Sequence, residues 1–457
     1  MKMPPEVVSE IFELCMPHRP ANHNPHSDSK FDFSAPFILG AVCQQWRRIA
    51  WSTPRLWTTI SMDLSTALSQ LPLARGWLSR SGTLPLSVFV RARNKFSILS
   101  NADFGPLISF LNENAHRWQS LVLDLPVSTF SCLRGDPQGR SILKTLKFVP
   151  LVHPEAPSGV VRWTSCSNNF DHKPTVVDVA WMPFPFIGIN WVNVTQAKVS
   201  GFSMDQVFEL LRSAPSMIQC SVFSISANEN HYPVPRYPIP SKFISHPNLE
   251  YLHLHLRVGE TLPLSRLSLP PLSVLTLGWH GVLNAQDFIS LIERSSPPLR
   301  VLTIANPTIR AGDFLQLLQA VPTITTLQLK MGKDYDTKAL FRILSDSALV
   351  RSDEGHRQLL PKLEAFEYIG FQNFPWSAVP KLFGPISELG HPGRRPLSRL
   401  HIGCYCNTPH DGELVLINDR ETVWKIQDLM GKGMKVEIED IGYFVRDILG
   451  MSIELHK

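Results

Sequence analysis

The chain has 457 residues, of which 44% are hydrophobic and 18% are charged, and its formal net charge is +5. This length predicts more than one folding unit or one elongated repeat array, and the basic residues form no run of five, so composition does not predict nucleic-acid binding. The sequence contains no stretch of about 18 consecutive apolar residues, so no membrane-spanning helix is expected. Its seven cysteines are scattered and no secretory signal is recognised, which predicts free thiols in the cytoplasm or nucleus.

The first residues predict a small helical module. Pro4 and Pro5 suit the first turn of a helix, and an apolar stripe then continues to Cys15. Residues 17–36 are rich in Pro, His, Asn, Ser and Asp, which predicts a loop. A second amphipathic helix is expected before Pro54, with the apolar residues Leu39, Val42, Cys43, Trp46, Ile49 and Ala50. So small a module, residues 1–60, has a marginal core and must pack on the rest of the chain or on a partner.

The remainder contains a repeated pattern. We interpret residues 61–115 as a helical linker or cap and residues 116–410 as an irregular array. Four copies of Leu-x-x-Leu-x-Leu are spaced by 23, 27 and 25 residues, the range of leucine-rich repeats, and begin at Leu249, Leu272, Leu299 and Ile324. Looser copies begin at Trp118, Leu143, Val194, Met217, Leu363 and Leu397.

Helical patterns lie between the expected strands. Ser203 and Asn284 are candidate helix N-caps, and prolines follow the expected helices. Strand, loop and helix repeat in that order, which predicts an α/β solenoid with parallel strands on its concave face and helices on its convex face. The Asn that usually ends such a repeat is missing, so we expect uneven loops, among them 153–190 and 225–247. An ordinary α/β domain with parallel strands is the alternative.

The last segment, residues 411–457, is expected to cap the array. Asp419 to Met430 predicts a helix, and the alternating residues from Met434 to Ile438 predict a strand that closes the open end of the sheet.

The sequence contains no motif that predicts catalysis or a cofactor. The common phosphate-binding, dinucleotide-binding, hydrolase and metalloprotease motifs are absent. His401, Cys404, Cys406 and His410 have zinc-ligand chemistry, but neighbours in a strand point to opposite faces, so we favour buried thiols and surface histidines. We therefore expect a non-catalytic chain with no cofactor and no metal.

Exposed aromatic and histidine side chains are the candidates for recognising a target protein, because such residues are enriched at the centres of interfaces. His253 and His255 share one face of an expected strand, and the others follow expected strands. The candidate target-binding residues are His253, His255, Trp279, Phe371 and Trp376.

The amino-terminal motifs resemble a known family. Pro4-Pro5-Glu6, Ile11-Phe12, Val42-Cys43, Trp46-Arg47 and Pro54-Arg55-Leu56-Trp57 occur in the order found in the F-box of the expanded F-box proteins of mushroom-forming fungi. The resemblance covers about 55 residues and implies that the module binds the Skp-type adaptor of SCF ubiquitin ligases. The adaptor-binding residues that it implies are Pro4, Pro5, Val8, Ile11, Phe12, Val42, Cys43, Trp46, Leu56 and Trp57.

The resemblance and the repeats together predict a substrate-recognition subunit. Its F-box would bind the adaptor and, through it, a cullin-RING ligase, while the repeat array would bind an unknown target protein. No nucleic acid and no membrane is expected as a partner. One alternative is an interaction scaffold outside any ligase, in which the F-box helices cap the solenoid; a weaker one is an enzyme with an unfamiliar site.

Overall fold

The computed structural model describes residues 3–16, 35–92, 104–136, 138, 141–151, 172–225, 237–239, 241–256, 264–278, 283–306, 309–332, 337–349, 358–371, 374–405, 416–441 and 445–456. They form two compact units. Unit 1 comprises the described residues of Met1–Phe202, Ser213–Met217 and Asn228–Tyr237, and unit 2 those of Ser203–Arg212, Ile218–Ala227 and Pro238–Lys457. Both units are α/β with a mostly parallel sheet, which confirms the predicted class.

The sheet of unit 1 follows the order of the chain. Each strand pairs in parallel with the next. In β1 and β5 successive residues alternate between half-buried and buried positions, and the buried positions are apolar. In the described residues its strands are β1 (Thr59–Asp63), β2 (Leu86–Arg91), β3 (Trp118–Pro126), β4 (Thr145–Leu151), β5 (Val176–Ala180) and β6 (Gln196–Ser200).

The helices of unit 1 include the expected amino-terminal module. The α-helices are α1 (Pro5–Leu14), α2 (Ala35–Val42), α3 (Gln44–Ser52), α4 (Ala67–Arg80) and α5 (Gly105–Glu113). Short 3-10 helices lie between them and the strands, namely η1 (Pro54–Trp57), η2 (Ala115–Arg117), η3 (Val127–Cys132), η4 (Phe184–Phe186) and η5 (Trp191–Asn193).

One predicted helix is in fact two. The apolar spacing through residues 39–50 predicts a single helix, but Cys43 has extended backbone angles, φ −158° and ψ 169°, and separates α2 from α3. Its Sγ accepts a hydrogen bond from the backbone N–H of Trp46 at 3.4 Å, so the side chain caps the first turn of α3.

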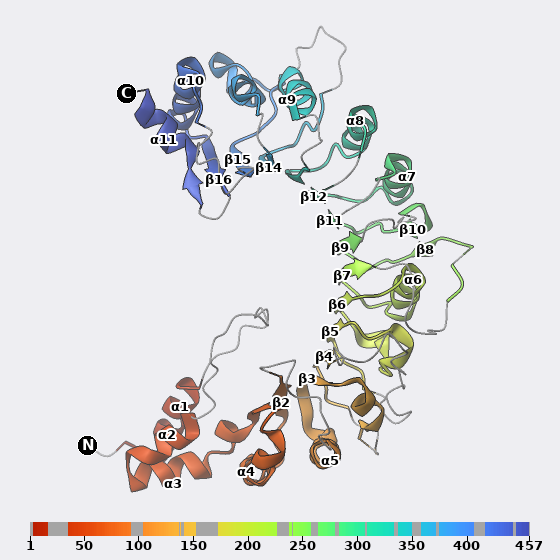
Figure 1. The fold of residues 1–457 in the computed structure, drawn as a ribbon, viewed down its shortest axis with the longest axis vertical. Coiled ribbons are helices and arrows are strands. Elements are labelled where there is room, and N and C mark those ends of the chain that lie inside the picture. The colour runs from red at the N-terminus through yellow and green to blue at the C-terminus, as the bar shows by residue number, and fades with distance from the viewer. Residues whose placement is uncertain are drawn as a thin grey trace. The chain divides into compact units, whose positions relative to one another are not determined.

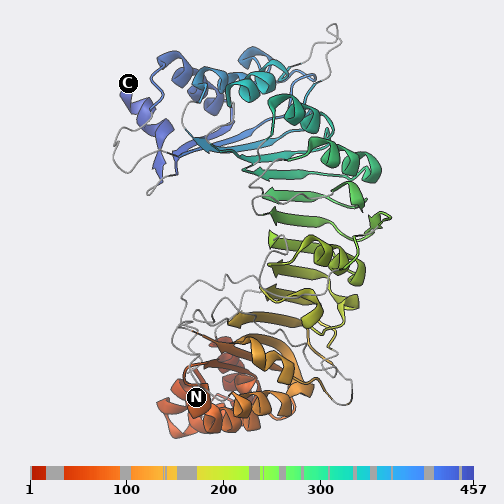
Figure 2. The ribbon, with the colours of Figure 1, turned by 45° about the vertical axis from the view of Figure 1, so that its right-hand side comes forward.

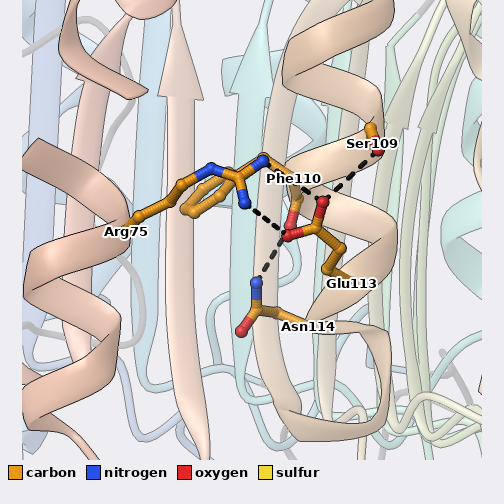
Figure 3. Close-up of polar contacts among 5 residues, drawn as sticks. All are labelled: Arg75, Ser109, Phe110, Glu113 and Asn114. Carbon is orange, nitrogen blue, oxygen red and sulfur yellow. Dashed lines mark hydrogen bonds and ion pairs between the residues drawn. The ribbon is translucent and has the colours of Figure 1, made fainter. Parts of the chain in front are cut away.

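The segment 61–115 differs from the predicted helical linker. It contains β1, α4, β2 and α5, so the strand–helix alternation begins directly after the amino-terminal helices. Figure 3 shows the contact between the two helices: Arg75 of α4 binds Glu113 of α5 through two hydrogen bonds of 3.0 and 3.2 Å, and its guanidinium lies 5.9 Å from the ring centroid of Phe110. Both charged side chains are about half exposed, so this pair adds only modestly to stability.

A strand also interrupts a predicted loop. Val176–Ala180 forms β5 inside the interval 153–190, where Val177 and Val179 are buried and the alternate positions are half-buried. The segment lacks the leucine pattern of the other strands, so only its short alternation of valines indicated a strand.

The sheet of unit 2 confirms the strands predicted from the repeated leucines. Its strands are β7 (Gln219–Ile225), β9 (Tyr251–Leu256), β11 (Val274–Gly278), β12 (Val301–Ala305), β13 (Thr326–Lys330), β14 (Ala365–Phe371), β15 (Arg399–Tyr405), β16 (Lys435–Asp440) and β17 (Arg446–Asp447). All neighbours are parallel except β16 and β17, and a separate parallel pair joins β8 (Ile244–Ser245) and β10 (Leu267–Ser268). The middle strands are in register, so Leu252, Leu275 and Leu302 lie side by side.

The helices of unit 2 cover one face of this sheet. Figures 1 and 2 show α7, α8 and α9 together on one side of the strands, and the other face carries none of the helices that the structure describes. The helices are α6 (Met204–Ser213), α7 (Ala285–Ser295), α8 (Ala311–Gln319), α9 (Thr337–Asp346), α10 (Arg420–Gly431) and α11 (Ile448–Leu455), with 3-10 helices η6 (Leu264–Arg266), η7 (Trp376–Ala378), η8 (Pro380–Phe383) and η9 (Ile386–Glu388).

The two predicted N-caps have different outcomes. Asn284 caps α7 as predicted, because its Oδ1 accepts hydrogen bonds from the backbone N–H groups of Gln286 and Asp287. The Oγ of Ser203 is buried without a hydrogen-bond partner, so the predicted side-chain cap of α6 is wrong. In the tail, the predicted helix and strand are present as α10 and β16, and β16 pairs with β15.

Candidate interaction surfaces

Exposed apolar side chains are concentrated on the three amino-terminal helices of unit 1. Trp46 is 37% exposed, Ile11 is 40% exposed and Val42 is 59% exposed. We call the exposed large apolar residues of this segment the amino-terminal apolar residues: Met3, Val7, Ile11, Leu14, Phe37, Ile38, Val42, Trp46 and Trp51. Surface apolar residues in such density are typical of a protein-interaction site.

A separate set of residues forms the core of the same helices. Phe12, Leu56 and Trp57 are each at most 1% exposed. The ring of Phe12 lies 5.0 Å from that of Trp46, so the exposed indole rests on this core. Among the predicted adaptor-binding residues, Phe12, Leu56 and Trp57 are thus buried in this structure, where they hold the helices together.

The other residues of that prediction are accessible. Pro4, Pro5, Ile11, Val42, Cys43 and Trp46 are exposed, and Val8 is half-buried. They lie on α1 and on the consecutive helices α2 and α3, with Cys43 at the break between the last two.

Polar contacts fix α1 against the end of α3. The hydroxyl groups of Ser9 and Thr53 are 3.0 Å apart, and the Thr53 hydroxyl donates to the carbonyl of Ile49 at 2.7 Å. Arg55 forms an ion pair of 3.2 Å with Glu13. Because the Ser9–Thr53 and Glu13–Arg55 contacts join residues more than 40 positions apart, they set how the amino-terminal helices present their exposed side chains.

The predicted target-binding residues are not brought together. His253 and His255 lie half-buried on β9, while Phe371 lies at the end of β14, with β11, β12 and β13 between the two strands. Trp376 belongs to η7 and stacks on Phe374 at 5.1 Å, and Phe374 is buried. Trp279 lies outside the described residues.

The histidines of β9 nevertheless take part in the helix-free face of unit 2. The ring of His253 lies 4.7 Å from that of Phe223 on β7. The ring of His255 covers Gly278 on β11, where a Cβ atom would collide with it. Both contacts join neighbouring strands, so these side chains help to cover the backbone of the sheet.

Polar side chains form a continuous row across this face, on strands β12 to β16. Thr303 donates to Gln328 at 2.8 Å, and Gln328 donates through Nε2 to Glu367 at 2.8 Å. His401 then lies between two carboxylates: its Nδ1 is 3.9 Å from Glu367 and its Nε2 is 3.4 Å from Glu439. We call Thr303, Gln328, Glu367, His401 and Glu439 the polar row.

Sequence reasoning missed the polar row, although it had a signal. Thr303, Gln328, Glu367 and His401 occupy the same position, between the second and third apolar residues, in successive copies of the repeat. The in-register pairing of parallel strands places equal positions side by side. Glu439 lies two residues beyond the corresponding position of β16, so only the structure identifies it as a member.

A cavity of about 580 Å³ lies in the helix layer of unit 2. It is lined by residues that follow α9 and by residues of η8, η9 and α10, including Leu349, Pro380, Lys381, Ile386 and Lys425. Beside it, Arg395 is 1% exposed and donates to the carbonyls of Leu344, Ser347 and Leu359 at 2.8–3.2 Å. Burial lowers the pKa of Arg395 to about 10, and its hydrogen bonds satisfy the carbonyl end of α9.

The described residues contain no group of three His, Cys, Asp or Glu side chains that could hold a metal ion. His401 faces the helix-free side of β15, whereas Cys404 is buried on the other side, as the strand alternation predicted. Cys406 and His410 lie outside the described residues. In the described segments no helix is long and apolar enough to cross a bilayer.

Comparison with known families and proteins adds no assignment. No family model matches the chain, and no curated protein matches it at a significant level.

Proposed function

We propose that the chain is a substrate-recognition subunit of an SCF-type ubiquitin ligase. In this proposal the amino-terminal helices α1–α3 are an F-box that binds the Skp-type adaptor. Units 1 and 2 carry leucine-rich-repeat-like strands and helices, and the helix-free face of the sheet binds a target protein.

The observation that carries the proposal is that the amino-terminal apolar residues are separate from the buried residues that form the core of the same helices. Phe12, Leu56 and Trp57 already provide the core. The exposed Ile11, Val42 and Trp46 are therefore not needed to hold the helices together. Exposed apolar side chains in such density lower the solubility of a protein unless a partner covers them. The order of motifs that resembles an F-box supplies the class of partner.

The chain would contribute position and no bond chemistry. Holding a target close to a charged conjugating enzyme raises the effective concentration of the two reactants, which accelerates transfer without a catalytic residue in the receptor.

Co-expression with a Skp-type adaptor, followed by size-exclusion chromatography, tests the proposal. We expect a stable one-to-one complex that is weakened by Trp46→Ala, a variant that leaves the buried Trp57 in place, with retained folding checked by circular dichroism. A well-folded full-length chain that elutes apart from the adaptor would overturn the proposal.

A second candidate is a scaffold in which the same helices cap the sheet of unit 1. It is favoured by an aromatic cluster that joins the module to α4, in which the ring centroids of Phe37, Trp57 and Trp77 lie 4.8–5.7 Å apart. The cluster suits both candidates, so the adaptor experiment separates them: the scaffold predicts a folded chain without a complex.

A further inference from the structure

The two carboxylates of the polar row have unfilled hydrogen-bonding capacity. Glu367 accepts one hydrogen bond of 2.8 Å from Gln328, and its other oxygen is 3.9 Å from His401. Among the described residues, the polar side-chain contact of Glu439 is with His401, whose Nε2 lies 3.4 Å from the carboxylate. A carboxylate offers about four acceptor positions, and these side chains remain 29% and 36% exposed, so a ligand can reach both.

The charges of the row do not balance. A neutral imidazole has a single N–H and can donate to only one of the two carboxylates, while a protonated imidazole neutralises only one of them. Lys330, Arg399 and Lys435 are exposed on the same strands, but in the described part of the chain none of them forms an ion pair with the row. Glu367 and Glu439 therefore keep a net negative charge that an external cation would complement.

An apolar surface lies directly beside the carboxylates. Ile369 of β14 is 9% exposed, and it closes over Gly403 of β15 together with Ile441. Further along the same strands, the rings of Phe371 and Tyr405 lie 5.3 Å apart, and Tyr405 is 39% exposed. This order of groups suits a lysine or arginine side chain followed by an apolar residue. The cationic group binds carboxylates and aromatic rings, and the long aliphatic stem packs on apolar side chains.

We infer that the helix-free face of β14, β15 and β16 binds an extended protein segment that carries arginine or lysine beside an apolar residue. The cationic group lies between Glu367 and Glu439, and the apolar residue packs on Phe371 and Tyr405. The inference rests on the proposed function in that the segment belongs to the target protein, and it adds the chemistry by which the target is recognised.

Selection from a random nine-residue peptide library, displayed on phage, tests this inference on the full chain. The double variant Glu367→Gln/Glu439→Gln is the counter-target, and Glu421→Gln/Asp428→Asn is its matched control. The control removes the same two negative charges from exposed positions of α10 in the helix layer of the same unit. Circular dichroism and thermal unfolding establish that both variants fold.

The expected result is enrichment of peptides with arginine or lysine next to an aliphatic or aromatic residue. Fluorescein-labelled copies of the enriched peptides should bind Glu367→Gln/Glu439→Gln about tenfold more weakly than the unmodified chain, and should bind the control variant unchanged within about twofold. Tyr405→Ala should weaken the same peptides. Absence of enriched peptides, enrichment without basic residues, or equal affinity for the double variant would overturn the inference.

The same variants, tested for adaptor binding by size-exclusion chromatography, separate this inference from the proposed function. If the unmodified chain forms the adaptor complex but shows no preference for basic peptides, the peptide site alone is rejected. A retained preference in a chain that fails to bind the adaptor rejects the ligase role and leaves the peptide site supported.

Discussion

The indole ring of Trp57 lies edge-on against that of Trp77, with centroids 4.8 Å apart and planes inclined by 74°. The Nε1 of Trp57 donates to the carbonyl of Ala50 at 2.9 Å, so one side chain is bound both to α3 and to α4. The core of the amino-terminal helices is thus continuous with the rest of unit 1, in agreement with the small apolar content of so short a module.

This packing predicts the effect of removing Trp57. Trp57→Ala deletes a fully buried ring and its hydrogen bond, so it should lower the free energy of unfolding of unit 1 by about 3–5 kcal/mol, measured by urea denaturation. Trp51→Ala is the matched control, because Trp51 is 42% exposed and lies against Arg47 and Arg80; it should cost about 1 kcal/mol or less. Equal losses in the two variants would contradict the assignment of Trp57 to the core.

Arg395 should be important for the stability of unit 2. Arg395→Met keeps the aliphatic stem but leaves the carbonyls of Leu344, Ser347 and Leu359 without their donor, and should lower the free energy of unfolding by about 2–4 kcal/mol. Arg399→Met, at an exposed position of β15, should have little effect. Thermal unfolding of the two variants measures the difference, and a neutral Arg395→Met would show that these hydrogen bonds do not stabilise the fold.

Alkaline pH should destabilise unit 2 through two buried groups. Burial raises the pKa of the Cys220 thiol to about 12, and chiefly burial raises that of the Tyr368 hydroxyl to about 12. The folded chain keeps protons that the unfolded chain releases, so the stability present at neutral pH is lost as pH rises from about 9 towards 12, by up to about 1.4 kcal/mol per pH unit for each group. Cys220→Ala should make the pH dependence of urea unfolding shallower, and an unchanged slope would contradict this prediction.

Two glycines of unit 2 should respond to alanine in opposite directions. Gly278→Ala places a Cβ against the ring of His255 and should destabilise the sheet by about 1–3 kcal/mol. Gly312 lies in α8, where a Cβ meets no atom within 4 Å, so Gly312→Ala should stabilise the chain by about 0.5–1 kcal/mol. Thermal unfolding compares the two, and a stable Gly278→Ala variant would show that His255 moves freely.

The strands predicted correctly from sequence are those whose inward residues repeat as leucines. Leu252 and Leu254 of β9 are at most 1% exposed, so the pattern directly reported the buried face. In contrast, β1 presents only Ile60 and Met62 as buried residues. Two apolar residues at spacing two are too few to distinguish a strand from a helical linker, which is why the strands of segment 61–115 were not predicted.

The remaining differences arise from contacts that a sequence pattern does not contain. The apolar spacing passes through Cys43 without a change, while the break there depends on its extended backbone and on a hydrogen bond to Sγ. Likewise, the repeat aligns Glu367 with His401, but Glu439 lies two residues beyond the aligned position of β16, and its 3.4 Å contact with His401 depends on side-chain geometry. Such long-range geometry follows from strand register and not from local propensity.

The most direct test of the central claim is the affinity of the full chain for a purified Skp-type adaptor, measured by isothermal titration calorimetry with Trp46→Ala and Trp51→Ala. Both residues are exposed tryptophans of α3, five positions apart and therefore on different sides of the helix. Our account predicts that Trp46→Ala weakens binding by about 2–4 kcal/mol and that Trp51→Ala leaves it nearly unchanged. Equal affinity of Trp46→Ala and the unmodified chain, or no binding by any folded form, would contradict it.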